Sequence, residues 1–469
     1  MTDSLTTRLG RLTPEQRAVL LSKLASSRAT PKLTDHVDPA RRRSRLGLDQ
    51  ERLWLLNQQN PSSSEYVLTF GLRLTGRFDR DSFVAALERA VQRHAILRSS
   101  VRVEDGVPEL WINDDAAIDL VEIDLRSVPD EERAGAARER MIQHVHRPFD
   151  LAAGPVLRVV LVRLGDDDHQ IAQAMHHSTT DQWSYALMNR EVLADYDDLV
   201  NGRALGEVHT PGVQFGDFAE WQRAYFASDA GRRHLEFWSS YLEGAPGQTQ
   251  LPYDRTPEDA DRSGEHFTFV LDADVGRAFL EAVRSLGMTV SSGLVAAYAG
   301  LLYEETGQRD VIVGLPSVTR GEPGSADIFG FLLSTLPFRI QMPSEPTLRD
   351  VLTAVRTSAT RVADHRETPF ALIVEAAAPA RALSQYPSCR PRTSTSTSTT
   401  PGSPTTKRPG CTRMPSPRTC LPWISPSHGG RRATSSTDVS STGAVSSTGR
   451  RSPVSLAASS NSSRPLQPT

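Results

Sequence analysis

The sequence predicts a mixed fold of the α/β or α+β class, and two observations carry this prediction. Strand-like apolar runs and amphipathic helix patterns alternate along the chain from Arg45 onwards. The second half of this region then repeats the style of the first half, although no short-period internal repeat is present. At 469 residues the chain has room for two or three domains.

In the first half, several apolar runs have the length and composition of strands. They cover residues 66–74, 97–103, 110–112, 157–164 and 171–175. Asp79 is placed to cap a helix whose apolar side chains recur at helical spacing, which puts His94 on the buried face. Acidic and glycine residues at 104–106 and 165–168 predict the turns that join two pairs of these strands.

The second half shows the same alternation of patterns. We expect strands at residues 266–271 and 311–315, and helices at 274–286, 290–305 and 347–363. Ahead of the globular region, a short amphipathic helix is predicted within residues 1–25. A polar and basic linker over residues 26–45 is predicted to follow it.

Residues 388–469 differ from the rest of the chain in composition. Their 82 positions contain 20 Ser, 14 Thr and 11 Pro, with 11 of the 53 basic residues and one of the 56 acidic residues, Asp438. Residues 1–387 therefore carry 42 basic and 55 acidic side chains, a formal charge of −13 against +10 for the tail. Such a mildly acidic body is not typical of a protein that binds nucleic acid.

The cysteines and the apolar runs narrow the class of protein further. All three cysteines, Cys389, Cys411 and Cys420, lie in the tail, so the body has neither a disulfide framework nor a thiol nucleophile. The sequence contains no signal-peptide core and no run near the roughly 18 apolar residues of a membrane span. We therefore expect a cytoplasmic protein that is not embedded in a membrane.

The most informative segment is His176-His177-Ser178-Thr179-Thr180-Asp181. It follows a predicted buried strand, and Asp181 stands where it can cap the next helix. An imidazole at a strand end can act as a general base or stabilise developing charge, because its pKa lies near neutrality. Adjacent histidines on a strand point to opposite faces, which argues against a shared metal site. Taken by itself, the segment also fits an ordinary polar loop.

Further segments stand in fixed order around the histidine pair. They are QERLWLL at 50–56, RHAILR at 93–98, DFAEW at 217–221, IFGF at 328–331 with TLPFR at 335–339, and HRETPF at 365–370. In this order they resemble the core motifs of the condensation domain of nonribosomal peptide synthetases, a branch of the chloramphenicol acetyltransferase superfamily. The resemblance covers about residues 45–385. It implies two similar lobes, 46–215 and 216–387, each a mixed sheet with flanking helices, arranged in a V around a central tunnel.

The resemblance implies an amide-forming acyltransferase with His176, His177 and Asp181 as its catalytic motif. His177 would position the attacking amine and take its proton, or would stabilise the tetrahedral intermediate. His176 is expected to be a packed, hydrogen-bonded residue. The family's motif acid is salt-bridged to an arginine, for which Arg98 is our first candidate and Arg339 our second.

The three residues after the motif, Gln182, Trp183 and Ser184, are expected near the tunnel or the substrate. Trp183 and Trp221 are nevertheless expected to pack mainly in the core, and Arg93 to belong to the framework. The family has Gly where Gln182 stands, and a longer side chain at a position that needs a permissive backbone or open space puts full activity in question.

The resemblance also implies the partners of the chain. A donor acyl thioester and an acceptor amine would each arrive on the phosphopantetheine arm of a carrier protein, so the chain itself needs no bound cofactor and no metal. Nothing in it matches an adenylation domain, a thioesterase or a carrier-protein serine motif. The expected partners are therefore carrier proteins and other synthetase modules or subunits, and the chain itself is expected to be monomeric. The helix within residues 1–25 either docks onto an upstream part of the synthetase or packs on the body.

Three alternatives remain beside the amide-forming enzyme. An ester-forming acyltransferase and an epimerising relative share the same histidine and aspartate pattern. A catalytically impaired module that only binds carrier proteins belongs to a different class of protein.

The tail permits two interpretations. Its excess of Arg, Ser, Thr, Pro and Gly is what a GC-rich coding sequence yields when it is read out of frame, and the apolar pattern stops near Pro387. A native disordered tail of low complexity is the other interpretation. We favour a frameshift, and we expect the lobe at 216–387 to be incomplete.

Overall fold

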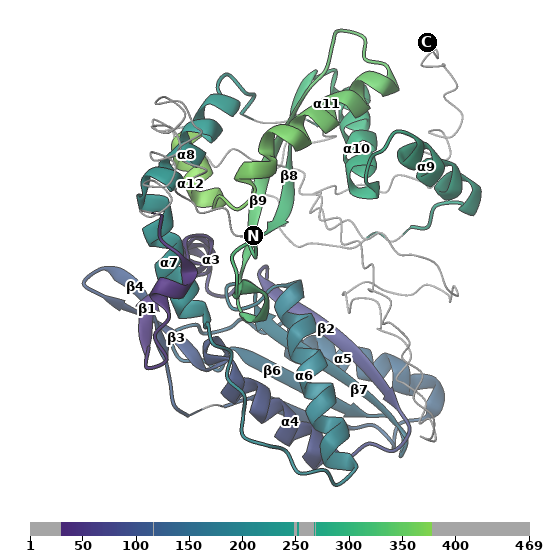
Figure 1. The fold of residues 1–469 in the computed structure, drawn as a ribbon. Coiled ribbons are helices and arrows are strands. Elements are labelled where there is room, and N and C mark those ends of the chain that lie inside the picture. The colour runs from purple at the N-terminus through teal and green to yellow at the C-terminus, as the bar shows by residue number, and fades with distance from the viewer. Residues whose placement is uncertain (1–29, 116, 248–250, 253–266, 268, 378–469) are drawn as a thin grey trace, which may run out of the picture. The chain divides into compact units, whose positions relative to one another are not determined.

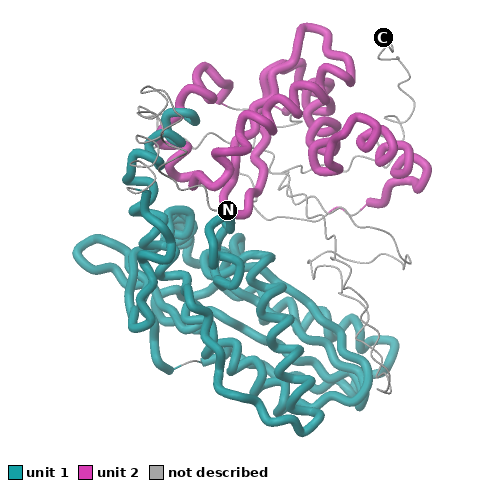
Figure 2. Tube along the Cα trace, viewed as in Figure 1, with its two compact units in different colours: residues 1–238, 319–333, 416–424 teal, residues 239–318, 334–415, 425–469 magenta. Residues whose placement is uncertain are grey.

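The computed structural model describes residues 30–115, 117–247, 251–252, 267 and 269–377. They divide into two compact units, shown in Figure 2. Of the described residues, the first unit holds 30–238 and 319–333, and the second holds the remainder. The predicted helix within residues 1–25 and the tail 388–469 lie outside the described residues.

A four-stranded sheet forms the centre of the first unit, with strand order β2-β7-β6-β5. Its strands are β2 (Val67–Thr75), β7 (Asp168–His176), β6 (Leu157–Arg163) and β5 (Asp119–Asp124). β7 pairs with both β2 and β6 in the antiparallel direction, whereas β5 and β6 are parallel. Val67 at the start of β2 pairs with His176 at the end of β7, so the histidine pair emerges at one end of this sheet.

Helices cover both faces of this sheet. α4 (Arg80–Arg93) and α6 (Gln182–Val200) lie together across the face in view in Figure 1, and α5 (Asp130–Val145) packs behind against β6 and β7. Phe70 of β2 stacks on Tyr185 of α6 with ring centroids 3.5 Å apart, which fixes α6 on the sheet. Because both faces are covered, every residue of β6 except its last is buried.

Local sequence signals start α4 as expected. Asp79 is the N-cap, and its carboxylate accepts a hydrogen bond of 2.7 Å from the backbone N–H of Ser82. His94, just after the last turn, is buried as the spacing predicted. The turn after β3 (Ser99–Glu104) is also where it was expected, with Asp105 and Gly106 both at positive φ before β4 (Val107–Ile112).

A smaller sheet, β1-β4-β3, contradicts the prediction of a linker over residues 26–45. β1 (Arg43–Arg45) pairs antiparallel with β4, and the 3-10 helix η1 (Leu33–His36) buries Leu33 almost completely. The polar composition of this stretch hid a single buried leucine and a short edge strand. Its backbone also accepts a hydrogen bond, because Trp221 donates its indole N–H to the carbonyl of Pro31.

The boundary predicted after residue 215 is also wrong. α7 (Phe215–Ala227) packs on η1, β1 and α3 (Leu48–Gln59), so it belongs to the first unit. Trp221 of this helix lies in the core, as predicted. The next helix, α8 (Asp229–Tyr241), runs across the boundary between the two units.

The second unit contains α9 (Ala273–Ser285), α10 (Val290–Thr306), β8 (Asp310–Val318), β9 (Leu333–Gln341), α11 (Leu348–Val362), the 3-10 helix η4 (Ala363–His365) and α12 (Phe370–Ala377). These elements confirm the predicted helices and the strand at 311–315. β8 and β9 form a two-stranded sheet. The strand predicted at 266–271 is not found in its described residues, because 267 and 269–271 belong to no helix or strand.

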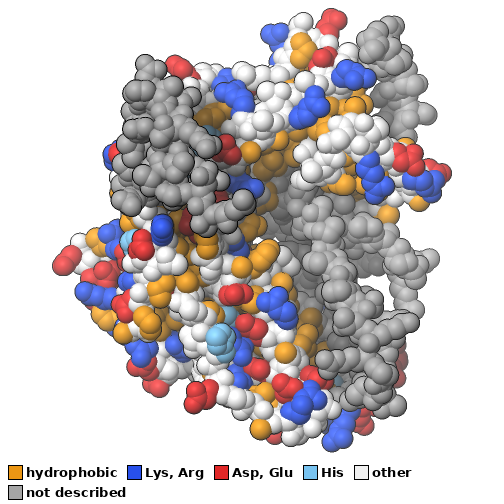
Figure 3. Space-filling view, viewed as in Figure 1, with side chains coloured by type: hydrophobic (Ala, Val, Ile, Leu, Met, Phe, Trp, Pro, Cys, Tyr) orange, Lys and Arg blue, Asp and Glu red, His pale blue; other side chains and the backbone are white. Residues whose placement is uncertain are grey.

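Two features are typical of other protein classes, a large surface area of one charge and an apolar membrane-spanning helix. On the face in Figure 3, basic and acidic side chains of the first unit are interspersed, with no large area of one sign. Within the described ranges, no single helix has the length and apolarity needed to cross a membrane, and α9 with α10 meets the criterion only as a pair bent by 109°.

Candidate active site

The segment between β7 and α6 has the local structure that the sequence predicted. β7 ends at His176, and the backbone N–H of His177 donates a hydrogen bond of 2.7 Å to the carbonyl of Tyr66, just before the start of β2. Asp181 is the N-cap of α6, and its Oδ1 accepts a bond of 2.7 Å from the N–H of Ser184. The histidines therefore stand at a strand end and the acid at a helix start.

His177 is arranged as a neutral base. Its Nδ1 lies 2.8 Å from the carbonyl oxygen of Thr180, and since a carbonyl only accepts, Nδ1 holds the proton. In the neutral ring, Nε2 then carries the lone pair, and it makes no hydrogen bond within the described part of the chain. Burial lowers the pKa of His177, although the Thr180 carbonyl and Asp181 oppose this effect.

His176 has the opposite tautomer. The backbone N–H of Ser178 donates to its Nδ1 at 3.2 Å, so Nδ1 is an acceptor and the proton of the neutral ring is on Nε2. Burial, with a smaller effect of neighbouring His177, lowers the pKa of His176 to about 4. The ring is only 2% exposed. These contacts confirm the expectation of a packed, hydrogen-bonded residue.

Asp181 forms a buried ion pair with Arg320. Its Oδ2 lies 3.2 Å from the guanidinium of Arg320, and both side chains are less than 5% exposed. Oδ2 also accepts a hydrogen bond of 3.1 Å from the N–H of Leu332. With the cap bond to Ser184, the carboxylate is thus held by an arginine and two backbone donors, a geometry that suits a structural role.

The sequence predicted a salt bridge here but named the wrong arginines. The guanidinium of Arg98 instead donates to the carbonyls of Val91 and Gln92, which lie in the last turn of α4 and need donors. Arg339 pairs with Asp310 at 2.6 Å, between β9 and β8 of the second unit. Arg98 therefore binds carbonyl groups at the end of α4 and Arg339 binds an acid on the neighbouring strand, and neither is the partner of Asp181.

Arg320 was missed because it lies outside all the motif segments. Its signal in the sequence is its position two residues after strand β8, at the start of the loop that precedes the motif at 328–331. The partner of a buried acid is set by the tertiary fold, and Asp181 and Arg320 are separated by 139 positions.

Residues 319–333, which we term the bridging segment, join β8 to β9 but belong to the first unit. Its Gly330 accepts from the Ser184 hydroxyl through its carbonyl at 2.8 Å and approaches the same oxygen with its N–H at 3.0 Å. A Cβ on Gly330 would lie 2.1 Å from the ring of Phe215, so only glycine fits. The bridging segment is thus tightly fitted to α6 and α7.

The three residues expected near the substrate differ in position. Gln182 and Trp183 are exposed at the start of α6, which is compatible with that expectation for both. Ser184 is completely buried with its hydroxyl bonded to Gly330 and Arg320, so the expectation is wrong for this residue. The core position expected for Trp183 is also wrong, because the side chain is 50% exposed and donates its indole N–H to the Ala326 carbonyl.

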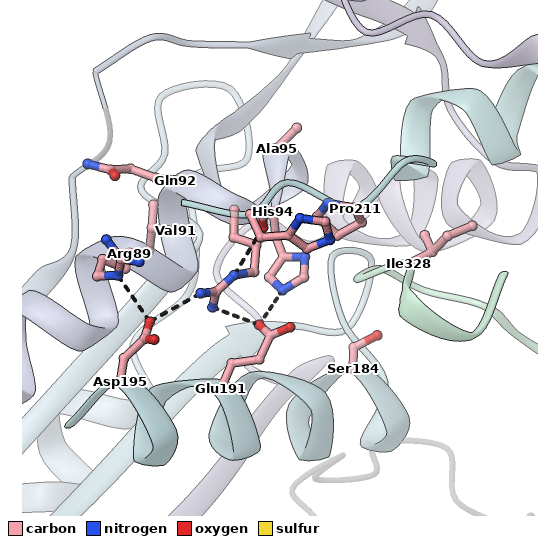
Figure 4. Close-up of polar contacts among 12 residues, drawn as sticks. Arg89, Val91, Gln92, His94, Ala95, Ser184, Glu191, Asp195, Pro211 and Ile328 are labelled. Carbon is pink, nitrogen blue, oxygen red and sulfur yellow. Dashed lines mark hydrogen bonds and ion pairs between the residues drawn. The ribbon is translucent and has the colours of Figure 1, made fainter. Parts of the chain in front are cut away.

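A charged network fastens α4 to α6 (Figure 4). His94 approaches Glu191 at 2.8 Å, and Arg93 lies 3.2 Å from both Glu191 and Asp195. Arg89 completes the network on Asp195. Burial raises the pKa of Glu191, but His94 and Arg93 outweigh it, and the net shift is downward. This network confirms that Arg93 is part of the framework.

The geometry at His177 suits proton transfer. Within the residues that the structure describes, no group of three or more His, Cys, Asp or Glu side chains is placed to hold a metal ion. His177 presents an unprotonated nitrogen from a fixed ring, and a lowered pKa keeps it unprotonated at neutral pH.

Comparison with known proteins gives a consistent result. A family model described as the condensation domain matches residues 45–399. The phosphinothricin tripeptide synthetase PhsC of Streptomyces viridochromogenes is 32% identical over 392 residues, which are 82% of this chain and 36% of that protein. The malpinin synthetase of Mortierella alpina is 31% identical over 344 residues, 73% of this chain and 4% of that synthetase. The matched part of the chain thus corresponds to 36% of the length of the first relative and to 4% of the length of the second.

Solved structures share the fold. The X-domain from teicoplanin biosynthesis superposes with a TM-score of 0.64 at 26% identity, over 73% of this chain and 75% of that chain. The first condensation domain of the calcium-dependent antibiotic synthetase has a TM-score of 0.61 at 22% identity, over 70% and 76% of the two chains.

Proposed function

Because the chain belongs to the condensation-domain family, whose members are acyltransferases that form amide bonds in nonribosomal peptide synthesis, we propose that it joins a thioester donor to an amine acceptor. One observation carries the proposal for this chain. His177 presents an unprotonated Nε2, fixed by the bond from Nδ1 to the Thr180 carbonyl. A condensation reaction needs such a group, since the attacking amine must lose a proton as it bonds to carbon.

In the proposed reaction, the amine nitrogen of the acceptor attacks the thioester carbonyl carbon of the donor. Nε2 of His177 accepts the amine proton as the C–N bond forms. The C–S bond then breaks, and the leaving thiolate takes the proton back from His177 as the free thiol. A neutral imidazole with its only N–H bound to a carbonyl favours this base role over donation to the oxyanion in the first step.

We propose that both substrates reach the site on the phosphopantetheine arms of carrier proteins, which belong to other synthetase modules. Tethering would remove much of the entropic barrier of a bimolecular reaction, so no covalent acyl-enzyme would be needed. The chain would work as a monomer in the cytoplasm, where its carrier proteins are loaded, and would bind no cofactor itself.

A reconstituted reaction tests this proposal. The chain is mixed with an acyl-loaded donor carrier protein and an aminoacyl-loaded acceptor carrier protein, and the amide product on the acceptor carrier is measured by mass spectrometry. Because we expect the lobe at 216–387 to be incomplete in the chain as written, the assay uses the chain with its reading frame restored near Pro387. We expect product only when this chain and both loaded carriers are present. A hydroxyacyl acceptor tests ester formation, and the configuration of the product's α-carbon tests epimerisation.

The impaired, carrier-binding alternative is favoured by one observation. Gln182 is exposed at the first position of α6, where the family has glycine. If its side chain obstructs the substrates, Gln182→Gly should increase amide formation and leave carrier-protein affinity unchanged. A wild type that binds carriers but forms no amide, with no gain in the glycine variant, would favour a binding module.

A further inference from the structure

Phe331 in the bridging segment lies directly against the ring of His177. The two ring centroids are 4.9 Å apart with an interplanar angle of 75°, the edge-to-face arrangement that aromatic pairs prefer. Phe331 is only 7% exposed, so its ring is packed in the unit. It is thus a large apolar group in contact with the base of the proposed reaction.

The backbone on both sides of Phe331 is held by hydrogen bonds. The preceding residue, Gly330, is bonded through its N–H and its carbonyl to the hydroxyl of Ser184. The following residue, Leu332, donates its N–H to Asp181. Because its two neighbours are fixed to the start of α6, Phe331 has little freedom to withdraw from the imidazole.

We infer that Phe331 is a positioning residue, which holds the His177 ring in place and shields one side of it from water. This inference rests on the proposed function and extends it to a residue that does not touch the reacting atoms. Together, the Thr180 carbonyl fixes the tautomer of His177, and Phe331 restricts the ring position in which Nε2 can accept a proton.

The effect that losing Phe331 would have on the pKa of His177 depends on burial and on the charges around the ring. Asp181 favours the protonated ring, Arg52 disfavours it, and His176 is itself neutral at pH 7 because of its lowered pKa. Arg320 is engaged with Asp181. Burial is the largest effect on the pKa of His177, and it lowers that pKa. Water admitted beside the ring would therefore raise the pKa towards its ordinary value.

The bridging segment provides a matched control. Phe329, two residues earlier, is also buried, and its ring packs against His94 at a centroid distance of 5.1 Å. Truncation of either ring removes a similar apolar contact from the same segment. Of these two rings, the one packed against His177 is that of Phe331.

The test compares Phe331→Leu with Phe329→Leu in the full chain. The pKa of His177 is followed by NMR in protein labelled at the histidine Cε1, with His177→Gln to assign the signal. In Phe331→Leu, we expect the pKa of His177 to rise and the acid limb of kcat to move to higher pH. We also expect kcat at neutral pH to fall on the order of tenfold with little change in KM. Phe329→Leu should leave the pKa and the acid limb in place.

Each other outcome has a definite meaning. An unchanged pKa in a folded Phe331→Leu protein would overturn the inference, and so would equal shifts in both variants, since that would indicate general loosening. If Phe331→Leu does not fold, Phe331→Met replaces the rigid ring with a flexible apolar side chain that adapts better to the space, and it is read in the same way. The NMR measurement needs no substrates, so it remains decisive even if the proposed condensation activity is not found.

Discussion

At the residue scale, the two adjacent histidines differ in which ring nitrogen holds the proton, and this difference gives them different roles. A backbone carbonyl accepts from Nδ1 of His177, whereas a backbone N–H donates to Nδ1 of His176. The first arrangement leaves Nε2 as an acceptor and the second turns Nε2 into a donor. The sequence could name His177 as the base only through family resemblance, because the partners that fix a tautomer are set by the folded loop.

His177→Ala should reduce the rate of amide formation by about two to three orders of magnitude, as expected when a general base is removed. The fold should persist, because the half-buried ring is held in the described part of the chain by one side-chain hydrogen bond, to the Thr180 carbonyl. The measurement is single-turnover product formation with loaded carriers, together with thermal unfolding. Retained turnover in the alanine variant would remove His177 from the proposed role.

His176 should make the first unit less stable in acid. Its pKa is about 4 in the folded state and about 6.5 when unfolded, so between these values only the unfolded chain binds the proton. Its contribution to stability is therefore complete above pH 6.5 and is lost as the pH falls to 4, by roughly 3 kcal/mol. Urea unfolding of wild type and His176→Asn at several pH values isolates the pH-dependent contribution of His176 to the free energy of unfolding. The stability difference between the two proteins should shift against wild type as the pH falls, and a constant difference would contradict the assignment.

At the element scale, one carboxylate links a helix start to a distant segment. Asp181 caps α6 and also holds the bridging segment through Arg320 and the N–H of Leu332. The cap was predictable, since Asp before an apolar helix is a local signal. The arginine was not, because ion pairing across 139 positions depends on tertiary packing.

Asp181→Ala should destabilise the protein by several kcal/mol, because it leaves Arg320 buried and unpaired. Asp181→Asn should cost less, since the amide still accepts the cap bond. Denaturant unfolding measures the free energy of unfolding of both variants. The matched control is Asp310→Ala, which removes the partner of Arg339 from a more exposed ion pair and should therefore destabilise the protein less. A variant of Asp181 that is as stable as wild type yet inactive would make the acid catalytic.

The predicted elements show where local pattern suffices. Strong periodicity placed the helix at 274–286 and its end before Gly287, which adopts a φ of +64°. It failed at 266–271, where an apolar run pairs with no strand in the described part of the chain, and at 26–45, where a polar composition concealed β1. Both errors concern pairing, which a single segment does not encode.

At the scale of the whole molecule, the second unit has a smaller sheet than the first and leaves several large apolar side chains exposed to solvent. Its described strands form a two-stranded sheet, and large apolar side chains near its start are 45–67% exposed. These are Phe267, Phe269, Val270, Leu271 and Val275. The superpositions leave about a quarter of each related chain unmatched. These observations support the proposal that the condensation-domain sequence is interrupted near Pro387, so that the second unit lacks part of the family's fold.

The composition after Pro387 leads to a prediction about the entire chain. Residues 388–469 are rich in Ser, Thr, Pro and Arg, and their sequence shows no apolar periodicity. We predict that the chain as written is poorly soluble or inactive, and that limited proteolysis removes this tail rapidly. Apolar surface left exposed in the second unit would promote aggregation.

Restoring the reading frame near Pro387 should therefore rescue both solubility and condensation, whereas truncation after residue 387 should rescue neither. The comparison separates a missing part of the fold from a merely harmful tail, because only the restored chain would supply apolar strands and helices to cover the second unit. Translation of the other two frames from this point should reveal such patterns in one of them. A soluble, active enzyme whose tail resists protease would show instead that residues 388–469 are a native part of the protein.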